Sequence, residues 1–223
     1  MTKKIRLIDI KEEILSENKG LAEKIRASLR KQNVLLINIM GSPGSGKTSL
    51  ILKTLEEIGS NYKIAVIEAD IETMIDAENI SRINVPVVQL HTGGFCHVDA
   101  NMLEKAIESL SLDKLDLVIL ENVGNLVCPA ESDTGALKNI AILSVPEGDD
   151  KPLKYPLMFA VCEVIVINKI DYLHYEDFNT EKVMENIKIL NKDSEIFRLS
   201  CKTNEGLEHW LNWLEKEIKD ASS

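Results

Sequence analysis

The stretch 41–48 has the residue types and the spacing of a phosphate-binding loop, Gly-x-x-x-x-Gly-Lys-Thr. Its glycines let backbone N–H groups approach a polyphosphate, Lys47 adds a positive charge, and the Thr48 hydroxyl is an oxygen ligand of the kind that Mg²⁺ prefers. An apolar run precedes the loop and a helical pattern follows it, which argues against a merely structural glycine-rich turn. The pattern therefore predicts a site for a nucleoside triphosphate with Mg²⁺, in contact with Gly41, Ser42, Gly44, Ser45, Gly46, Lys47, Thr48 and Ser49.

A second motif, Asn168-Lys169-Ile170-Asp171, directly follows an apolar run and favours guanine as the base. An ionised carboxylate only accepts hydrogen bonds, so Asp171 can take both the ring N–H and the exocyclic amino group of guanine. Adenine offers no such pair of adjacent donors. We expect Asn168 to tie loops together and Lys169 to lie over the base, although an ordinary polar exit from a strand is an alternative.

Ser200-Cys201-Lys202 follows the last apolar run, where GTPases place a Ser-Ala-Lys-like loop against the base. We expect the backbone N–H of Cys201 to face the guanine oxygen, and the thiol itself to be structural rather than reactive. With the two motifs above, this triplet predicts GTP as the bound nucleotide.

Two acidic residues at strand ends are candidates for holding Mg²⁺ together with Thr48, and for supporting hydrolysis together with Lys47. Glu121 follows a buried apolar run and precedes Gly124, whose N–H could meet the γ-phosphate. Asp70 ends the second apolar run, where capping a following helix is an equally good interpretation. The next loop is polar enough to be a nucleotide-sensing switch, with Glu72, Thr73 and Asp76.

Cys96, His97 and Cys128 lie in loops that follow predicted strands, on the nucleotide side of the sheet. Two thiolates and an imidazole favour Zn²⁺ or Ni²⁺ over Mg²⁺. Three ligands leave such a site incomplete, and a second chain across a symmetry axis could complete it. Without a Cys-x-x-Cys or His-x-x-x-His pattern, the spacing alone slightly favours two buried cysteines and an unrelated histidine.

Apolar runs alternating with helical patterns must position these residues. We predict strands at 34–40, 63–69, 85–90, 115–120, 139–145, 163–167 and 195–199, and helices that include 9–31, 98–109, 181–190 and 207–218. This order predicts an α/β P-loop NTPase with a mainly parallel sheet and helices on both faces. We expect one GTPase domain over residues 1–223, with residues 1–33 as an N-terminal helical extension.

The composition excludes several classes of partner. A formal net charge of −10 argues against a nucleic-acid partner. No apolar run is long enough for a membrane span or a signal peptide, so we expect a cytoplasmic protein. The four cysteines are far apart, which favours thiols or metal ligands over disulfides.

Four segments together resemble the HypB family of hydrogenase nickel-incorporation GTPases, in the SIMIBI class of P-loop proteins. They are Gly-Ser-Pro-Gly-Ser-Gly-Lys-Thr, His-Thr-Gly-Gly-Phe-Cys-His-Val-Asp-Ala, Glu-Asn-Val-Gly-Asn-Leu-Val-Cys-Pro-Ala and Asn-Lys-Ile-Asp. The resemblance implies a GTP-hydrolysing metallochaperone that forms a GTP-dependent homodimer and works with hydrogenase maturation proteins. It places Cys96, His97 and Cys128 at a metal site in the dimer interface, and favours the magnesium role of Asp70 and Glu121.

The resemblance also sets limits. Segment 145–151 matches a family segment near the dimer contact, from which Lys151 or Lys154 could reach the partner's nucleotide. Residues 1–33 contain no Cys and no His, unlike family members with an N-terminal nickel-binding motif.

A urease accessory GTPase would be expected to carry a Cys-Pro-His motif, which is absent. A small-molecule kinase would not need the guanine motif, and a binding module with a structural nucleotide would not hydrolyse GTP.

Overall fold

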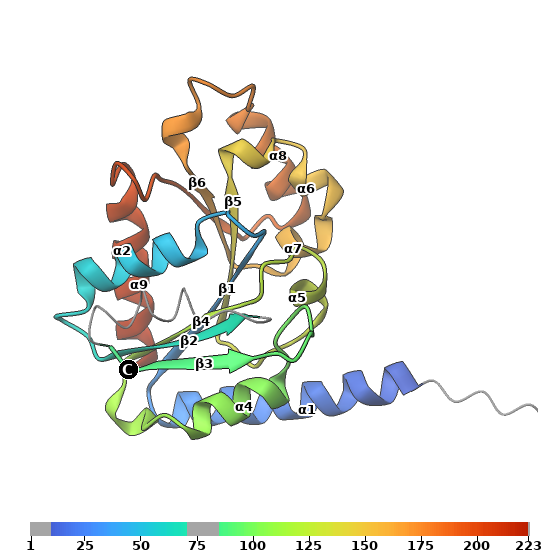
Figure 1. Cartoon of the computed structure of the whole chain (residues 1–223), viewed down its shortest axis with the longest axis vertical. Coiled ribbons are helices and arrows are strands. Elements are labelled where there is room, and N and C mark those ends of the chain that lie inside the picture. Colours follow the sequence, from blue (N-terminus) through green and yellow to red (C-terminus); the bar gives the residue numbers. More distant parts are fainter. Residues whose placement is uncertain (1–9, 71–84, 223) are drawn as a thin grey trace, which may run out of the picture.

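Seven parallel strands form one sheet in the computed structural model (Figure 1). The structure describes the backbone of residues 10–70 and 85–222, and the side chains within 17–69 and 85–222. The strand order is β3-β2-β4-β1-β5-β6-β7, and every neighbouring pair is parallel. The strands are β1 Leu35–Gly41, β2 Ile64–Asp70, β3 Val87–His91, β4 Leu117–Glu121, β5 Lys138–Ser144, β6 Val164–Asn168 and β7 Glu195–Arg198.

Helices cover both faces of this sheet, which confirms the predicted α/β class. The α-helices are α1 Ile10–Lys31, α2 Lys47–Ile58, α4 Ala100–Glu108, α5 Cys128–Glu131, α6 Lys151–Lys154, α7 Pro156–Val161, α8 Thr180–Leu190 and α9 Leu207–Ala221. Short 3₁₀ helices lie at η1 Leu112–Lys114, η2 Val145–Glu147 and η3 Ile170–Tyr172.

The element boundaries differ from the sequence-based ones by a few residues, for local reasons. The strand expected from residue 85 begins at Val87, because Pro86 has no N–H to give to a neighbouring strand. The helix expected from residue 98 begins at Ala100, because the Asp99 carboxylate caps it by accepting from the N–H of Met102 at 2.8 Å.

One face of the sheet packs against α2 and α9. Alternate residues of β1, Leu35, Ile37 and Ile39, point into this core. On α9, Trp210 and Trp213 stack with ring centroids 5.3 Å apart. The Trp210 indole Nε1 donates to Thr54 Oγ1 on α2 at 3.0 Å, so a buried hydrogen bond joins the two helices.

The other face packs against two groups of helices, α1 with α4 and α7 with α8. Figure 1 shows α1 lying alongside α4 near the β3 edge of the sheet. Since all strands are parallel, their carboxyl ends meet at one edge, where α/β sheets bind ligands. Within the described ranges, no helix is long and apolar enough to cross a membrane.

Candidate functional site

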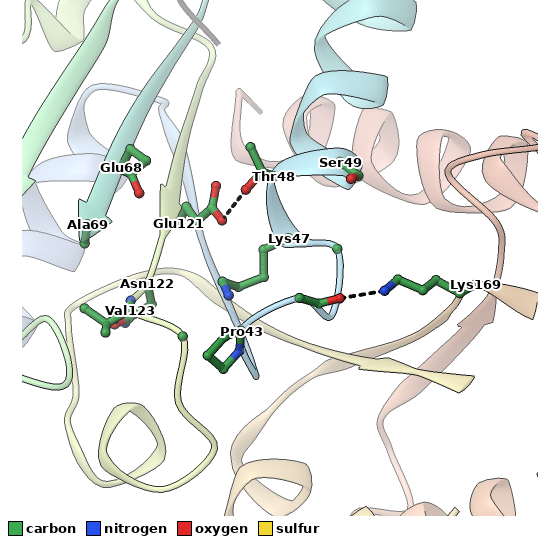
Figure 2. Close-up of a pocket in the computed structure, with 13 residues that line it drawn as sticks. Pro43, Lys47, Thr48, Ser49, Glu68, Ala69, Glu121, Asn122, Val123 and Lys169 are labelled. Atoms are coloured by element: carbon green, nitrogen blue, oxygen red, sulfur yellow. Dashed lines mark hydrogen bonds between the residues drawn. The ribbon is translucent and has the colours of Figure 1, made fainter. Parts of the chain in front are cut away.

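The phosphate-binding loop lies between β1 and α2, and α2 starts at Lys47 (Figure 2). Gly46 caps this helix in the left-handed region with φ of 102°, and a Cβ at this position would collide with the amide of Asn168. The Lys47 ammonium donates to the carbonyl oxygens of Ser42 at 3.2 Å and Gly41 at 3.4 Å. The lysine therefore lies inside the loop, close to where phosphate oxygens bind in this motif.

Thr48 and Glu121 meet at the end of β4. The Thr48 hydroxyl donates to Glu121 Oε1 at 2.8 Å, and the Glu121 side chain is buried. A hydroxyl beside a carboxylate is an oxygen-only donor set, which suits Mg²⁺. Asp70 is the last residue of β2, and its side chain lies outside the described part of the chain, as do Glu72, Thr73 and Asp76.

Glu68 is a site residue that the motifs did not reveal. It lies opposite Glu121 in the register of β2 and β4 and is 3% exposed. The available signal was an acidic residue inside an otherwise apolar run, since a charged side chain is rarely buried without a functional or structural partner. The structure therefore places two buried carboxylates beside the phosphate-binding loop.

A cleft of about 500 Å³ connects the loop to these acids. Gly124, whose N–H is a predicted contact of the γ-phosphate, lines this cleft. So does the side chain of Lys169, whose Nζ donates to the Gly44 carbonyl at 2.7 Å (Figure 2). The full lining is Pro43, Gly44, Gly46, Lys47, Thr48, Ser49, Glu68, Ala69, Glu121, Asn122, Val123, Gly124 and Lys169.

A smaller hollow of about 170 Å³ shares Ser49 and Lys169 with this cleft. Asp171 lines it, and Asp171 Oδ1 accepts a hydrogen bond from the Ser200 hydroxyl at 2.6 Å. Asn168 Nδ2 donates to the Ser45 carbonyl at 3.0 Å, so this asparagine does join the base loop to the phosphate loop. The two hollows therefore adjoin, one beside the phosphate-binding loop and the other beside the motif 168–171.

Cys201 differs in part from its predicted role. Burial raises the pKa of its thiol to about 11, which keeps it neutral and fits a structural residue. Its backbone N–H, however, donates to Asn168 Oδ1 at 3.3 Å rather than facing open space. The N–H of Lys202 donates to the Ser200 hydroxyl at 3.2 Å. Hydrogen bonds from the Ser200 hydroxyl and the Cys201 N–H therefore fix the side chains of Asp171 and Asn168.

Cys96, His97 and Cys128 come together into one cluster although they lie in two loops. Their potential ligand atoms all lie within 4.8 Å of one another, and all three side chains are half-buried. Cys96 Sγ is 3.9 Å from His97 Nδ1, and Asn125 Nδ2 donates to Cys128 Sγ at 3.4 Å. A hydrogen bond with Cys128 and partial burial raise the pKa of the Cys96 thiol.

This donor set fits a soft or borderline divalent ion. Two sulfurs and an imidazole nitrogen are ligands of Zn²⁺ and Ni²⁺, and a bound cation would remove the repulsion between adjacent thiolates. The described residues of one chain supply three ligands, one fewer than a four-coordinate site needs. An exposed apolar residue directly precedes each cysteine of the cluster in sequence, Phe95 at 59% and Val127 at 48% exposure.

Two asparagines connect this cluster to the nucleotide cleft. The backbone N–H of Asn125 donates to the Gly41 carbonyl at 3.1 Å, while its side chain contacts Cys128. The buried Asn122 follows Glu121. Its Oδ1 accepts a hydrogen bond at 3.1 Å from the N–H of Val98, the residue that follows His97. Each loop of the cluster is therefore hydrogen-bonded to an element of the cleft.

Lys151 and Lys154, the candidates for a contact with a partner's nucleotide, both contact residues of their own chain. Lys154 forms an ion pair with Asp150, and Lys151 Nζ lies 5.6 Å from the ring centroid of Tyr155.

Comparison with known proteins identifies the family. The model of the CobW/HypB/UreG nucleotide-binding domain matches residues 34–198. The chain is 42% identical to the hydrogenase maturation factor HypB of Escherichia coli strain K12 over 212 residues, 95% of this chain and 73% of that protein. The chain belongs to the HypB family. This confirms the resemblance drawn from the motifs and a nucleotide-binding domain over residues 34–198.

Other HypB-family proteins agree. The hydrogenase/urease maturation factor HypB of Helicobacter pylori strain J99 is 40% identical over 221 residues, 97% of this chain and 90% of that protein. A crystal structure of HypB from Helicobacter pylori in complex with nickel superposes with a TM-score of 0.87 at 36% identity, covering 93% of this chain and 97% of that one.

Proposed function

We propose that this chain is a GTP-hydrolysing metallochaperone that assists nickel insertion into [NiFe]-hydrogenase. The observation that carries the proposal is the cluster of Cys96, His97 and Cys128, which lies beside a nucleotide cleft in a HypB-family fold. In this proposal residues 1–223 act as one GTPase domain in the cytoplasm, where thiols stay reduced.

The nucleotide side of the proposal assigns each residue a role. Asp171 selects guanine, with Ser200 orienting its carboxylate. Lys47 and the backbone N–H groups of the loop hold the phosphates. Thr48, Glu121 and Asp70 would hold Mg²⁺, which would supply charge neutralisation for the phosphates.

The cluster side of the proposal treats Ni²⁺ as cargo, with Zn²⁺ as the competing ion. A second copy of the chain supplies the remaining ligands, so the metal-loaded form is a GTP-dependent homodimer. Phe95 and Val127 are exposed and directly precede the cluster cysteines, and apolar side chains at that position suit a contact between two copies. Other hydrogenase maturation proteins deliver or receive the nickel.

The two sides are coupled through the loops that they share. GTP binding changes the position of Lys47 and therefore the environment of the Gly41 carbonyl, which also accepts from Asn125. Asn125 in turn donates to Cys128. Hydrolysis then releases both the dimer contact and the metal, as in other order–disorder switches of GTPases.

Metal binding tests the cluster. The wild-type chain, loaded with a non-hydrolysable GTP analogue, should bind Ni²⁺ or Zn²⁺ stoichiometrically. The variant with Cys96→Ala and Cys128→Ala should bind neither ion, while its affinity for the analogue stays unchanged. Cys162→Ala is the matched control, because Cys162 is fully buried in a different part of the core. Unchanged metal stoichiometry in the double variant would show the site assignment to be wrong.

Nucleotide turnover separates this proposal from a small-molecule kinase and from a binding module. The wild-type chain should release inorganic phosphate from GTP without an added acceptor, and Lys47→Ala should reduce turnover by about 10²-fold or more. No phosphate release by either protein would favour a binding module with a structural nucleotide. Release that requires a small-molecule acceptor would favour a kinase.

Urease maturation is a second candidate function, because a Helicobacter pylori relative is named for both hydrogenase and urease. The chain can be expressed in a bacterium that has both enzymes and lacks its own HypB. Rescue of hydrogenase activity alone supports the first function, and rescue of both activities supports a wider supply of nickel.

A further inference from the structure

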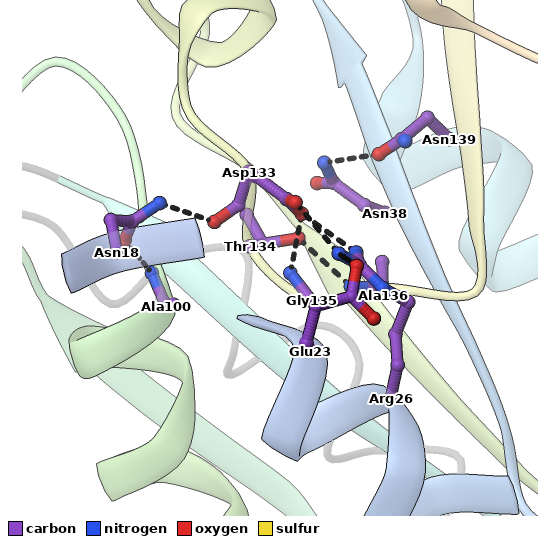
Figure 3. Close-up of polar contacts among 10 residues, drawn as sticks. All are labelled: Asn18, Glu23, Arg26, Asn38, Ala100, Asp133, Thr134, Gly135, Ala136 and Asn139. Carbon is purple, nitrogen blue, oxygen red and sulfur yellow. Dashed lines mark hydrogen bonds and ion pairs between the residues drawn. The ribbon is translucent and has the colours of Figure 1, made fainter. Parts of the chain in front are cut away.

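Helix α1 contacts both of the segments that follow the ligands of the cysteine–histidine cluster, through the polar side chains in Figure 3. Asn18 uses both ends of its amide. Its Oδ1 accepts from the backbone N–H of Ala100 at 2.9 Å, and its Nδ2 donates to the backbone carbonyl of Asp133 at 2.7 Å. One side chain on α1 thus joins two segments that are separate in sequence.

Each partner of Asn18 lies a few residues after the cluster ligands of one segment. Ala100 is the first residue of α4 and follows shortly after Cys96 and His97. Asp133 lies just beyond the short helix α5, which begins at Cys128. The separation between these two backbone segments is therefore fixed by the length of one asparagine side chain.

Arg26, two turns further along α1, fixes the second loop more firmly. Its Nη1 and Nη2 donate to the two carboxylate oxygens of Asp133, each at 2.8 Å (Figure 3). The Arg26 side chain is only 17% exposed, so solvent screens this two-point contact less than an open surface pair. The same carboxylate accepts from the backbone N–H of Gly135 at 3.0 Å, which closes the loop on itself.

The packing of Gly135 shows how closely the loop lies on the helix. Its φ is +89°, and a Cβ at this position would lie 2.9 Å from the carbonyl oxygen of Ala22 and 2.9 Å from Cβ of Ile25. Only glycine allows this approach of loop backbone to helix backbone. The segment after Cys128 therefore packs in one defined position against α1.

We propose that Asn18 and Arg26 are positioning residues for the metal cluster, because they hold the loop of Cys96 and His97 and the loop of Cys128 at the separation that one metal ion requires. This inference rests on the proposed metal-binding function. Preorganising ligands from two loops removes a conformational cost that would otherwise reduce metal affinity. Contacts that touch the ligands directly typically change metal affinity by about 10–100-fold, and Asn18 and Arg26, which act through the loops, should lie at the low end of that range.

A metal-free measurement tests the positions of the two thiols directly. Dibromobimane cross-links only thiols that lie close together, so it should join Cys96 to Cys128 in the wild-type chain. Asn18→Ala should slow this cross-linking several-fold. Asn101→Ala is the matched control, since Asn101 is exposed on α4, and it should leave the rate unchanged.

A titration with Ni²⁺ tests the consequence. Asn18→Ala and Arg26→Ala should each weaken Ni²⁺ binding about tenfold and change the thiolate-to-nickel absorption band, with the affinity for a GTP analogue unchanged. Arg26→Lys keeps the charge but loses the two-point contact, and it should restore only part of the affinity. Arg30→Ala, an exposed arginine one turn along the same helix, should behave as wild type.

The outcomes separate this inference from the proposed function. Wild-type cross-linking rates and wild-type Ni²⁺ affinity in folded Asn18→Ala and Arg26→Ala would overturn the positioning role while leaving the metal site intact. If Asn18→Ala does not fold, the cross-linking rate and the Ni²⁺ affinity are measured on Arg26→Lys instead. A wild-type chain that cross-links but binds neither Ni²⁺ nor Zn²⁺ would overturn the proposed function and this inference with it.

Discussion

The nucleotide side and the metal side of this molecule are held in place differently. On the nucleotide side, residues of the short motifs contact one another directly, as Asn168 contacts Ser45 and Ser200 contacts Asp171. On the metal side, the ligands come from two segments that are held by Asn122 and Asn125 and, in addition, by Asn18 and Arg26 of a separate helix.

The difference teaches where each side is vulnerable. The motifs of the nucleotide side follow buried strands, so the sheet itself sets their positions. The metal side also follows strands, β3 and β4, but its ligands lie several residues beyond the strand ends, where long-range polar contacts add to their positioning. We expect changes in those contacts to reduce metal binding while the nucleotide side keeps its function.

The largest expected effect is on base recognition. Asp171→Asn should weaken GTP binding by about 10³–10⁴-fold, because the amide cannot accept both guanine donors, and it should favour a xanthine nucleotide, whose C2 oxygen accepts from the amide N–H. Titration with fluorescent GDP and XDP measures both effects. Asp177→Asn, an exposed change nearby, is the control. Nickel affinity without nucleotide should not change, and a loss there would contradict the separation of the two sides.

The second effect is on the packing of Gly135 against α1. Gly135→Ala should lower the free energy of unfolding by about 1–3 kcal/mol, because the new methyl group meets α1 and the positive φ disfavours alanine. Urea denaturation measures it. Gly20→Ala is the matched control, since Gly20 lies within α1 with nothing close to a Cβ, and it should stabilise the chain by up to about 1 kcal/mol. Equal stability of the two variants would contradict the close packing.

A third effect concerns the asparagine between the two sides. Asn125→Ala keeps the backbone contact with Gly41 but removes the contact with Cys128, so nickel affinity should fall about tenfold with nucleotide affinity retained. Isothermal titration with Ni²⁺, with and without a GTP analogue, measures both affinities. Asn61→Ala, an exposed change just beyond the C-terminal end of α2, should have no effect. A fall in nucleotide affinity of similar size would show that the two sides are not separable at Asn125.

The smallest effect is on pH dependence. Hydrogen bonding from Arg26 lowers the pKa of Asp133, so this pair contributes stability that is fully present above the ordinary aspartate pKa of about 4 and is lost as pH falls through the lowered value. At pH 7 we expect a coupling energy of about 1 kcal/mol from a double-mutant cycle with Arg26→Ala and Asp133→Asn. The coupling should decline as pH falls below about 4. A coupling that instead increased in acid would contradict the ion pair.

The same contrast explains what could be predicted from the sequence. Contiguous motifs with a fixed place at a strand end, such as 41–48 and 168–171, predicted the fold and a nucleotide-binding domain. The cluster ligands were found by residue type, and the structure then brought Cys96 and Cys128 together from separate loops.

Residues whose role depends on distant contacts were missed. Asn18 meets Asp133 across 115 positions of sequence, and no local pattern marks an asparagine on a polar helix face. Glu68 had a weak signal, an acid in an apolar run, but its relation to Glu121 depends on the strand order. The boundaries at Val87 and Ala100 depend on backbone hydrogen bonding near Pro86 and Asp99, which periodicity does not resolve.

The packing of α9 against α2 gives the protein an intrinsic fluorescence signal for movement between these two helices. Both tryptophans lie on α9, and Trp210 is hydrogen-bonded to Thr54 on the helix that begins at Lys47. The tryptophan emission of the unlabelled protein therefore comes from one place, the contact between α9 and α2. A fluorescence change on adding GTP reads a shift of α2 against α9, whereas motion confined to the loops of Cys96 and Cys128 is optically silent.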